Sequence, residues 1–238
     1  ELYEPFFDPE DGLYRGQASF IDIGINGYPP DIPFHSIEAY RRSVNIKASS
    51  TNALYYKGMC VMQQTAERLG LSEEAAEWKK RATALRRSFR IRFIRPDGGI
   101  TYFINKTGFP EQRREILGTA FAVLHGLVEE EEAVEAFKGY PQAWWGVPLF
   151  TPFYEDGATY HNNSAWPFAN SFFLRAKAYA TGIDTLPYEL ALLVRSCHGD
   201  TFHEWTNAFT CKPSGKSAQL WTIGPFLRAA AQTGKLKT

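Results

Sequence analysis

The sequence predicts an all-α fold, a toroid of antiparallel helical pairs of the kind known as an α/α barrel. Two observations predict it. Apolar residues recur at helical spacing over most of the chain after residue 50, and short and long connections alternate between the resulting helices. Hairpins arranged around an axis place their long connections at one end. We therefore expect the connections 1–30, 139–163 and 199–216 to lie together.

Start and stop signals set the bounds of the predicted helices. Helix 50–69 has an Asn or Ser/Thr cap at its start and ends at Gly70. Helix 72–93 is capped by Ser72, with Glu in its first turn and Arg toward its end. The remaining elements are a strand at 100–104 and helices at 111–127, 130–137, 166–181, 188–197 and 217–233. Because a ring of six hairpins has twelve helices, we expect an (α/α)6 toroid that is incomplete in this chain.

Composition narrows the class of protein. The chain has 238 residues, 44% of them hydrophobic, which is enough for one domain with a substantial core. We expect residues 1–238 to form a single α/α-barrel domain that is the C-terminal part of a larger barrel. A formal net charge of zero and the lack of a Lys/Arg stripe argue against nucleic acid as a partner. No apolar run reaches the length of a membrane span, so we expect no membrane partner.

The three cysteines and five histidines lack the spacing of a metal site, and no Gly-rich phosphate loop is present. We therefore expect neither a metal nor a cofactor. Cys60 lies in an apolar helical run and is expected in the core. A Cys197–Cys211 disulfide remains open if the compartment is oxidising. We expect a soluble protein, with the bacterial periplasm or the extracellular space as candidate locations.

Aromatic residues are the unusual feature of the composition, at 15%, and many lie in connections beside Pro, Gly or polar residues. Trp145 is one of them. The densest group is Tyr160-His-Asn-Asn-Ser-Ala-Trp-Pro-Phe168, which joins a connection to the helix at 166–181. Sugars need hydrogen bonds for their hydroxyls and flat surfaces for their C–H faces, and this group offers both. The alternative is a capped helix with a packed Trp, in which Asn163 or Ser164 is the cap.

Two carboxylates are candidates for acid–base chemistry. Asp22 follows the apolar pair Phe20-Ile21, and burial there would raise the pKa of an Asp, as a general acid requires. Glu204 lies in the long connection 199–216 among polar residues, which favour an ionised carboxylate. A turn or cap residue is the alternative for Asp22, and a surface residue for Glu204.

Other charged residues compete for these roles. Glu155-Asp156 could bind hydroxyls or a cation, but Asp-Gly is also ordinary turn chemistry. The run Arg113-Arg114-Glu115 reads as an ion-pair network at a helix start, although one member could reach a pocket.

Four pieces of the sequence, in order, resemble the catalytic half of the six-hairpin glycosidases, the α/α-barrel group that includes processing α-glucosidase I, trehalase and glycogen-debranching glucosidase. The resemblance is closest to the bacterial members related to α-glucosidase I. The pieces are Leu13-Tyr-Arg-Gly-Gln-Ala-Ser-Phe-Ile-Asp22, Ser50-Thr-Asn-Ala-Leu-Tyr-Tyr56, Tyr160-His-Asn-x-x-x-Trp-Pro-Phe168, and Phe202-x-Glu204 followed by Gln219-Leu-Trp221. Ile23 stands where the family carries a Trp after its acid.

The resemblance implies an inverting, exo-acting glycoside hydrolase that cleaves α-linked glucosides in an oligosaccharide or disaccharide. It implies Asp22 as general acid and Glu204 as general base. It also implies a sugar pocket lined by Arg15, Tyr160, His161, Asn162, Trp166, Gln219 and Trp221. A carbohydrate-binding protein without hydrolytic activity, on the same scaffold, is the alternative. A sugar epimerase or isomerase is a third option, for which only His161 and His203 are candidate histidines.

Overall fold

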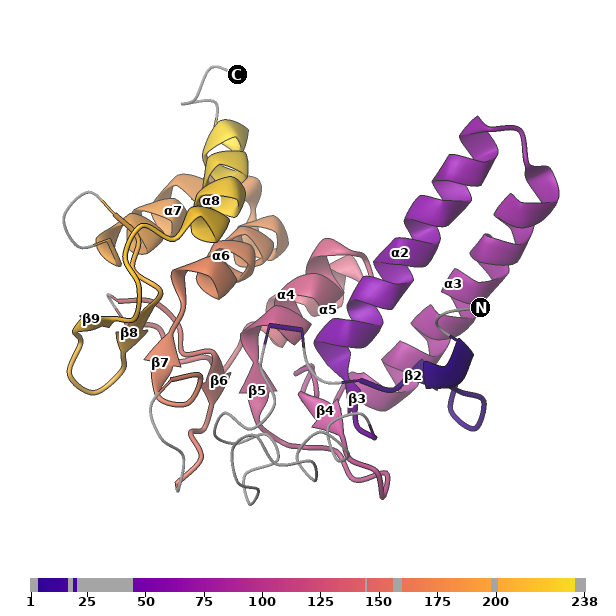
Figure 1. Ribbon diagram of the computed structural model, residues 1–238, viewed down its shortest axis with the longest axis horizontal. Helices are drawn as coiled ribbons and strands as arrows, with labels where there is room; N and C mark the ends of the chain where they lie inside the picture. Colours follow the sequence, from indigo (N-terminus) through magenta and orange to yellow (C-terminus); the bar gives the residue numbers. More distant parts are fainter. Residues whose placement is uncertain are drawn as a thin grey trace.

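The computed structural model of the protein describes residues 4–16, 19–20, 45–143, 145–155, 160–197 and 201–233, and these are mostly helical (Figure 1). The helices are η1 (Glu4–Phe6), α2 (Ser49–Arg68), α3 (Ser72–Phe93), α4 (Ile116–Leu124), α5 (Glu130–Ala136), α6 (Pro167–Thr181), η2 (Ile183–Thr185), α7 (Leu186–Arg195) and α8 (Leu220–Gln232). The strands are β1 (Phe7–Asp8), β2 (Leu13–Tyr14), β3 (Lys47–Ala48), β4 (Phe103–Ile104), β5 (Arg114–Glu115), β6 (Phe150–Thr151), β7 (Ser164–Ala165), β8 (Trp205–Asn207) and β9 (Pro213–Ser214).

The helices form an arc of an all-α toroid. α2, α4, α6 and α8 form one row in which each helix packs against the next, and α3, α5 and α7 pack against members of this row. α2 and α8 lie at opposite ends of the arc (Figure 1). The predicted fold class is thus confirmed, including an incomplete ring.

Local signals define the α2–α3 hairpin well. α2 ends one residue before the predicted bound, and Gly70 adopts a φ of +74°, a conformation that glycine enters without steric cost. α3 has the predicted bounds and buries Ala82, Leu85, Phe89 and Phe93, which recur at three- and four-residue spacing and so form one apolar stripe.

The predicted helix 111–127 is wrong in its first part. Arg114 and Glu115 form β5, which pairs antiparallel with β6 so that Glu115 lies opposite Phe150. The Glu115 side chain then accepts hydrogen bonds from the N–H groups of Leu117 (2.7 Å) and Gly118 (2.6 Å), and so caps α4. A strand partner 35 positions away in the chain overrides the local helical pattern.

The strand predicted at 100–104 is shorter, with only Phe103–Ile104 in β4, and the last three predicted helices differ from α6, α7 and α8 by up to three residues at an end. The proposed caps of α6 are also wrong. Ser164 belongs to β7, Asn163 adopts a φ of +57°, and the helix begins after Trp166 with Pro167 in its first turn.

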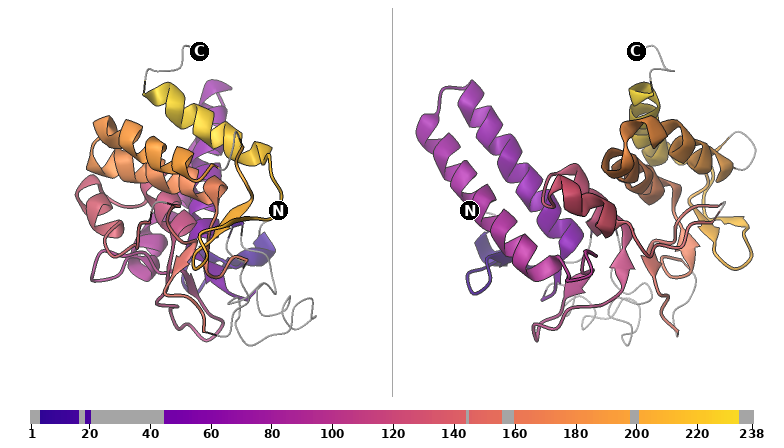
Figure 2. Two further views of the ribbon diagram at one scale, coloured as in Figure 1. Left: turned by 90° about the vertical axis from the view of Figure 1, so that its left-hand side faces the viewer. Right: turned by 180° about the vertical axis from the view of Figure 1, so that it is seen from behind.

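The strands lie along one side of the arc, below the helices in Figure 1, and the two further views agree (Figure 2). All pairings are antiparallel: β1–β2, β3–β4, β5–β6 and the three-stranded β7–β8–β9. The described parts of the long connections therefore lie on this one side of the arc, as expected, although residues 4–16 are at its α2 end and residues 201–216 at its α8 end (Figure 1).

One hydrophobic core runs through most of the arc, from Leu13 to Leu193, and its largest fully buried side chains include Trp166, Tyr102 and Phe89. Cys60, Cys197 and Cys211 are free thiols, so the Cys197–Cys211 disulfide is absent. Cys60 packs against the core. Within the described ranges, we find no helix with the length and apolarity needed to cross a membrane.

Candidate functional site

The candidate site is centred on a hydrogen bond between residues 44 positions apart in the chain. The Tyr160 hydroxyl donates to Glu204 Oε1 at 2.7 Å. Pairing of β7 with β8, in which Ser164 lies opposite Asn207, brings the two segments together. The two residues singled out from separate connections are therefore neighbours in the fold.

The second carboxylate oxygen of Glu204 is also held. Oε2 accepts the N–H of Lys216 at 2.9 Å, and the Glu204 N–H donates to the Lys216 carbonyl at 2.8 Å. Gly215 permits this approach. It has a φ of +73°, and a Cβ added there would lie 2.7 Å from the Glu204 Cβ. The carboxylate is thus fixed from both sides.

Phe20 is the centre of an aromatic cluster next to this carboxylate. Its ring centroid lies 5.3 Å from His161, 4.9 Å from Trp166 and 5.5 Å from Trp221. Phe20 also has a φ of +76°, a left-handed conformation that is rare for an aromatic residue and marks strain of the kind found at functional sites. Tyr160 packs edge-on against Trp166 at 4.9 Å, which joins the cluster to Glu204.

The two tryptophans of the predicted pocket have different positions. Trp166 is 1% exposed, and its Nε1–H donates to the Tyr160 carbonyl and to Ser164 Oγ, both at 3.1 Å. The expectation that Trp166 offers its face to a ligand does not fit this burial. Trp221 is 43% exposed and stacks on Phe168 at 5.2 Å. The accessible aromatic surface therefore belongs to Trp221, with Trp166 behind it.

His161 is buried at 2% exposure between Phe20, Tyr160 and Trp166. Burial lowers the pKa of His161 to about 3, so the ring is neutral near pH 7. Its Nδ1 is buried and has no hydrogen-bond partner among the described residues. A neutral ring nitrogen in this position can donate to, or accept from, a hydroxyl group.

Asn162 braces a connection. Its amide nitrogen donates to the Tyr154 carbonyl at 2.9 Å, and its oxygen accepts the Tyr154 N–H at 3.0 Å. The side chain is fully buried. The expected contact of Asn162 with a sugar does not fit this arrangement, because both ends of its amide are held by the backbone.

The remaining predicted residues are spread around the site. Gln219 precedes α8, two residues from Trp221, and its N–H donates to the Phe202 carbonyl at 3.1 Å. Trp145 is partly exposed between Ala143 and Gly146, which form an isolated bridge. Arg15 lies beside β3 and contacts Asp8, as described below. Asp22, the predicted acid, lies outside the described residues, and so does Asp156.

The charged run Arg113-Arg114-Glu115, an alternative source of site residues, makes contacts that stabilise the fold. Arg113 donates to Glu111 at 3.0 Å and its guanidinium lies 3.6 Å from the centre of the Tyr154 ring. Arg114 pairs with Asp97 at 3.1 Å, as an ion-pair network predicts. Glu115 is the cap of α4, and its burial raises its pKa to about 8.

Sequence reasoning missed three contributors: the central place of Phe20, the stacking partner Phe168, and Gly215. Phe20 and Phe168 lie inside the motifs 13–22 and 160–168. Their position beside the polar residues of these motifs was the signal that could have placed them in the site. Gly215 follows Pro213-Ser214, an ordinary turn sequence, and only its position against Glu204 reveals its role.

No known family model matches the sequence, and no curated protein matches it. Several solved structures are similar. A sialidase matches with a TM-score of 0.66 and 14% identity over 93% of this chain and 22% of its own. Neutral trehalase Nth1 from Saccharomyces cerevisiae matches with a TM-score of 0.62 and 13% identity over 96% of this chain and 54% of its own.

PssZ from Listeria monocytogenes is also similar, with a TM-score of 0.60 and 11% identity over 98% of this chain and 65% of its own. The chain thus spans between about a fifth and two thirds of the length of these structures. At these identities the likeness establishes the fold alone. That fold is the helical arc described above, which the chain shares with neutral trehalase Nth1.

Proposed function

We propose that the protein is an inverting, exo-acting glycoside hydrolase that removes a glucose unit from α-linked oligosaccharides or disaccharides. The observation that carries the proposal is the Tyr160–Glu204 hydrogen bond beside the aromatic cluster. It places a fixed carboxylate, one of the two carboxyl groups that glycoside hydrolysis requires, beside a stacking surface for a sugar.

In the proposed mechanism Glu204 is the general base. Tyr160 and the Lys216 N–H orient its two oxygens, and each oxygen keeps a lone pair that can accept a proton from water. Asp22 is the proposed acid, which protonates the leaving oxygen. Asp22 follows Phe20 by two residues in the sequence. Phe20 packs against Trp166, and Trp166 packs against Tyr160, the residue that donates to Glu204.

The proposed sugar contact of Trp221 follows from its exposure of 43%: its ring stacks on the C–H face of the sugar. His161, which is 2% exposed, lies behind this surface with Trp166 and supports it as a neutral ring. Gln219, close to Trp221 at the start of α8, supplies a polar contact.

A carbohydrate-binding protein without hydrolytic activity is the second candidate. One observation favours it: both oxygens of Glu204 already accept a hydrogen bond, which makes this residue an equally good structural brace. Ile23, in place of the family's Trp, points the same way.

A product assay separates the two. The full chain is incubated with α-linked glucose disaccharides, and NMR records the anomeric form of the glucose released at early times. Release of β-glucose that stops in Glu204→Gln supports the inverting hydrolase. Retained α-configuration contradicts inversion. Saturable binding of the disaccharides with no turnover supports the binding protein.

A further inference from the structure

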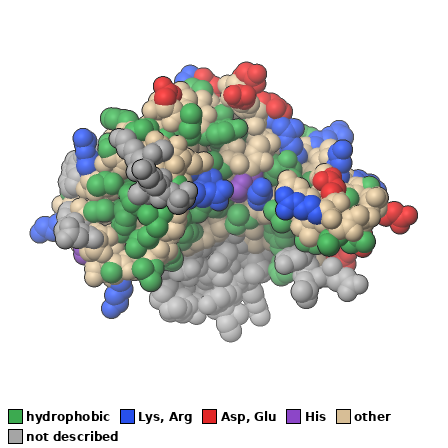
Figure 3. All heavy atoms as spheres, turned by 90° about the horizontal axis from the view of Figure 1, so that it is seen from above, with side chains coloured by type: hydrophobic (Ala, Val, Ile, Leu, Met, Phe, Trp, Pro, Cys, Tyr) green, Lys and Arg blue, Asp and Glu red, His purple; other side chains and the backbone are tan. Residues whose placement is uncertain are grey.

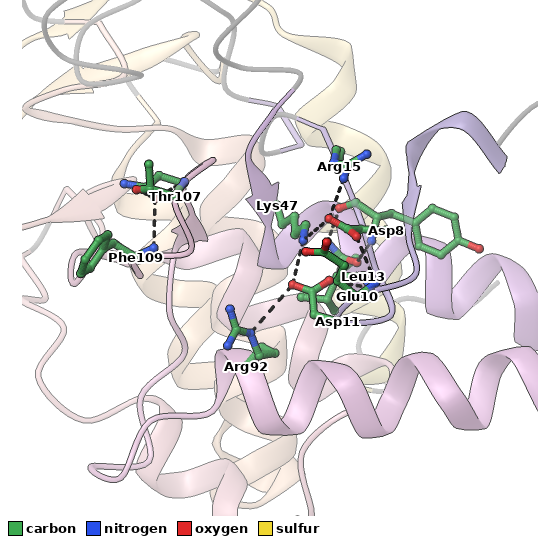
Figure 4. Close-up of polar contacts among 12 residues, drawn as sticks. Asp8, Glu10, Asp11, Leu13, Arg15, Lys47, Arg92, Thr107 and Phe109 are labelled. Carbon is green, nitrogen blue, oxygen red and sulfur yellow. Dashed lines mark hydrogen bonds and ion pairs between the residues drawn. The ribbon is translucent and has the colours of Figure 1, made fainter.

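A second polar site lies at the other end of the arc from Glu204, beside β2 and β3 (Figure 4). It is a cavity of about 530 Å³ between the turn that follows β1 and the turn at 105–108. Four cationic side chains and three carboxylates line it, and its lining includes no aromatic side chain. Its chemistry is therefore unlike that of the aromatic site.

Each oxygen of the two inner carboxylates of this cavity already accepts at least one hydrogen bond. Asp8 Oδ2 accepts from Lys47 Nζ and from Arg15 Nη2, each at 2.7 Å, while its other oxygen accepts a backbone N–H of the turn. Asp11 accepts from Lys47 Nζ at 2.7 Å and from a second backbone N–H. Asp8 is 5% exposed, and its pKa lies below the usual value because Lys47 donates to it.

Most donors of the cavity, in contrast, remain available. Arg15 uses one guanidinium nitrogen, on Asp8, and its side chain is 38% exposed. Arg92 Nε lies 3.9 Å from Asp11, beyond hydrogen-bond length, and this side chain is 39% exposed. Figure 4 shows Arg15 and Arg92 on opposite sides of the Asp8–Lys47–Asp11 group.

The facing turn presents a further cation in a fixed position. The Asn105 side-chain oxygen accepts from the Thr107 N–H at 3.0 Å, from the Thr107 hydroxyl at 2.7 Å and from the Phe109 N–H at 3.0 Å. These bonds hold the turn that carries Lys106, which is exposed and lines the cavity. Lys106 makes no ion pair with the described residues.

From occupied acceptors and spare donors we infer that this cavity binds the carboxylate of an acidic sugar. An Arg guanidinium matches a carboxylate in geometry and can donate two parallel hydrogen bonds to it. The amide nitrogen of Asn105 and the hydroxyl oxygen of Thr107, both in the lining, suit sugar hydroxyls. The third carboxylate, Glu10, is exposed and leaves the cations in excess by one.

Binding here is separable from the proposed hydrolysis. Of the cavity residues, only Arg15 belongs to the predicted pocket for a terminal sugar, so the variants are placed at Arg92 and Lys106. Loss of hydrolysis in Glu204→Gln would leave acidic-sugar binding intact, and loss of that binding would leave hydrolysis of neutral glucosides intact.

Isothermal titration of the full chain with D-glucuronate, D-glucose and acetate tests the inference. The first two differ at one carbon, a carboxylate against a hydroxymethyl group. We expect glucuronate to bind more tightly than either other probe. We expect Arg92→Gln together with Lys106→Gln to weaken glucuronate binding by about tenfold. Lys79→Gln together with Lys80→Gln, two exposed α3 cations outside this cavity, is the charge-matched control and should bind as the parent does.

Three results would overturn the inference. Glucose binding as tight as glucuronate binding removes the role of the carboxylate. Acetate binding as tight as glucuronate binding shows that the sugar ring contributes nothing to recognition. Equal losses in Arg92→Gln/Lys106→Gln and in Lys79→Gln/Lys80→Gln show a general effect of net charge. Circular dichroism of each variant checks that the helices are intact.

Discussion

The aromatic site around Glu204 and the charged cavity around Asp8 each hold a carboxylate, but with different hydrogen-bond donors. Both hold a carboxylate that is partly or fully removed from water. Glu204 is held by a phenol and a backbone N–H, with no cation paired to it among the described residues, whereas Asp8 is held by Lys47 and Arg15. A carboxylate held by neutral donors keeps its full charge for chemistry, whereas one held by cations is neutralised and serves to position them.

The two sites also differ in the ligand that we expect each of them to bind. The Glu204 region offers flat apolar surface and one charge, which suits a neutral sugar. The Asp8 region offers spare cations and no aromatic lining, which suits an anion. On a surface where hydrophobic and Lys/Arg side chains form distinct groups, as Figure 3 shows for one face, two such sites can coexist. The predictions below test this division.

The largest expected effect concerns the proposed acid and base. Asp22→Asn and Glu204→Gln should each lower the hydrolysis rate of an α-linked disaccharide by about 10²–10⁴-fold. With Asp22→Asn, a substrate with a good leaving group should recover much of the rate, because it needs little protonation. With Glu204→Gln the recovery should be absent, because delivery of water is missing. Steady-state kinetics on both substrate types measure this. Equal loss on both substrates in Asp22→Asn would show that Asp22 is not the acid.

Crowding Glu204 should have the next largest effect. Gly215→Ala places a Cβ against the Glu204 side chain at a residue with φ of +73°, so the carboxylate must move. A displacement of this kind can cost about a hundredfold in rate. Gly70→Ala is the matched control, since Gly70 has a φ of +74° and an added Cβ there meets nothing within 4 Å. Activity in Gly215→Ala equal to that in Gly70→Ala would show that the Glu204 position is not critical.

The two tryptophans should respond in opposite ways. Trp166→Ala removes a side chain that is 1% exposed and should lower the free energy of unfolding by about 3–5 kcal/mol. Trp221→Ala removes a half-exposed face and should weaken sugar binding by roughly 1 kcal/mol, about fivefold, with little change in stability. Urea unfolding and titration with glucose measure the two effects. Unchanged sugar affinity in Trp221→Ala would remove this residue from the site.

Acid should weaken the two regions in different pH windows. His161 has a folded pKa of about 3 against an ordinary value of 6.5, so the stability it contributes is full above pH 6.5 and is lost as the pH falls toward 3. His125, with a pKa of about 4 from burial and the nearby Lys57, adds to the same window. Asp8, with a pKa below 3.8, loses its contribution only below that value.

NMR of the histidine rings and urea unfolding between pH 7 and pH 4 measure these windows. The free energy of unfolding should fall across this range, and part of the slope should disappear in His161→Gln. The His161 ring should stay neutral to pH 4. A ring that titrates near pH 6.5 would place His161 in water and contradict the buried site.

The sequence by itself determined the fold class and the bounds of the helices that depend on local signals. The bounds of α3 were predicted because its charged ends and its apolar stripe lie within its own length. The predicted side-chain caps of α2 and α3 are wrong: the cap positions are Ala48 and Leu71, neither of which caps through its side chain. The polar and aromatic motif at 160–168 and the carboxylate Glu204 were recognisable as residue types, although their roles as sugar ligands and base remain predictions.

Only the tertiary structure decided which residues meet. Pairing of β5 with β6 turned the start of a predicted helix into a strand and made Glu115 a cap. Pairing of β7 with β8 brought Tyr160 to Glu204. The same packing placed Trp166 behind Trp221. Helix signals act over one or two turns, whereas strand pairing and burial depend on segments tens of residues away, which no local pattern records.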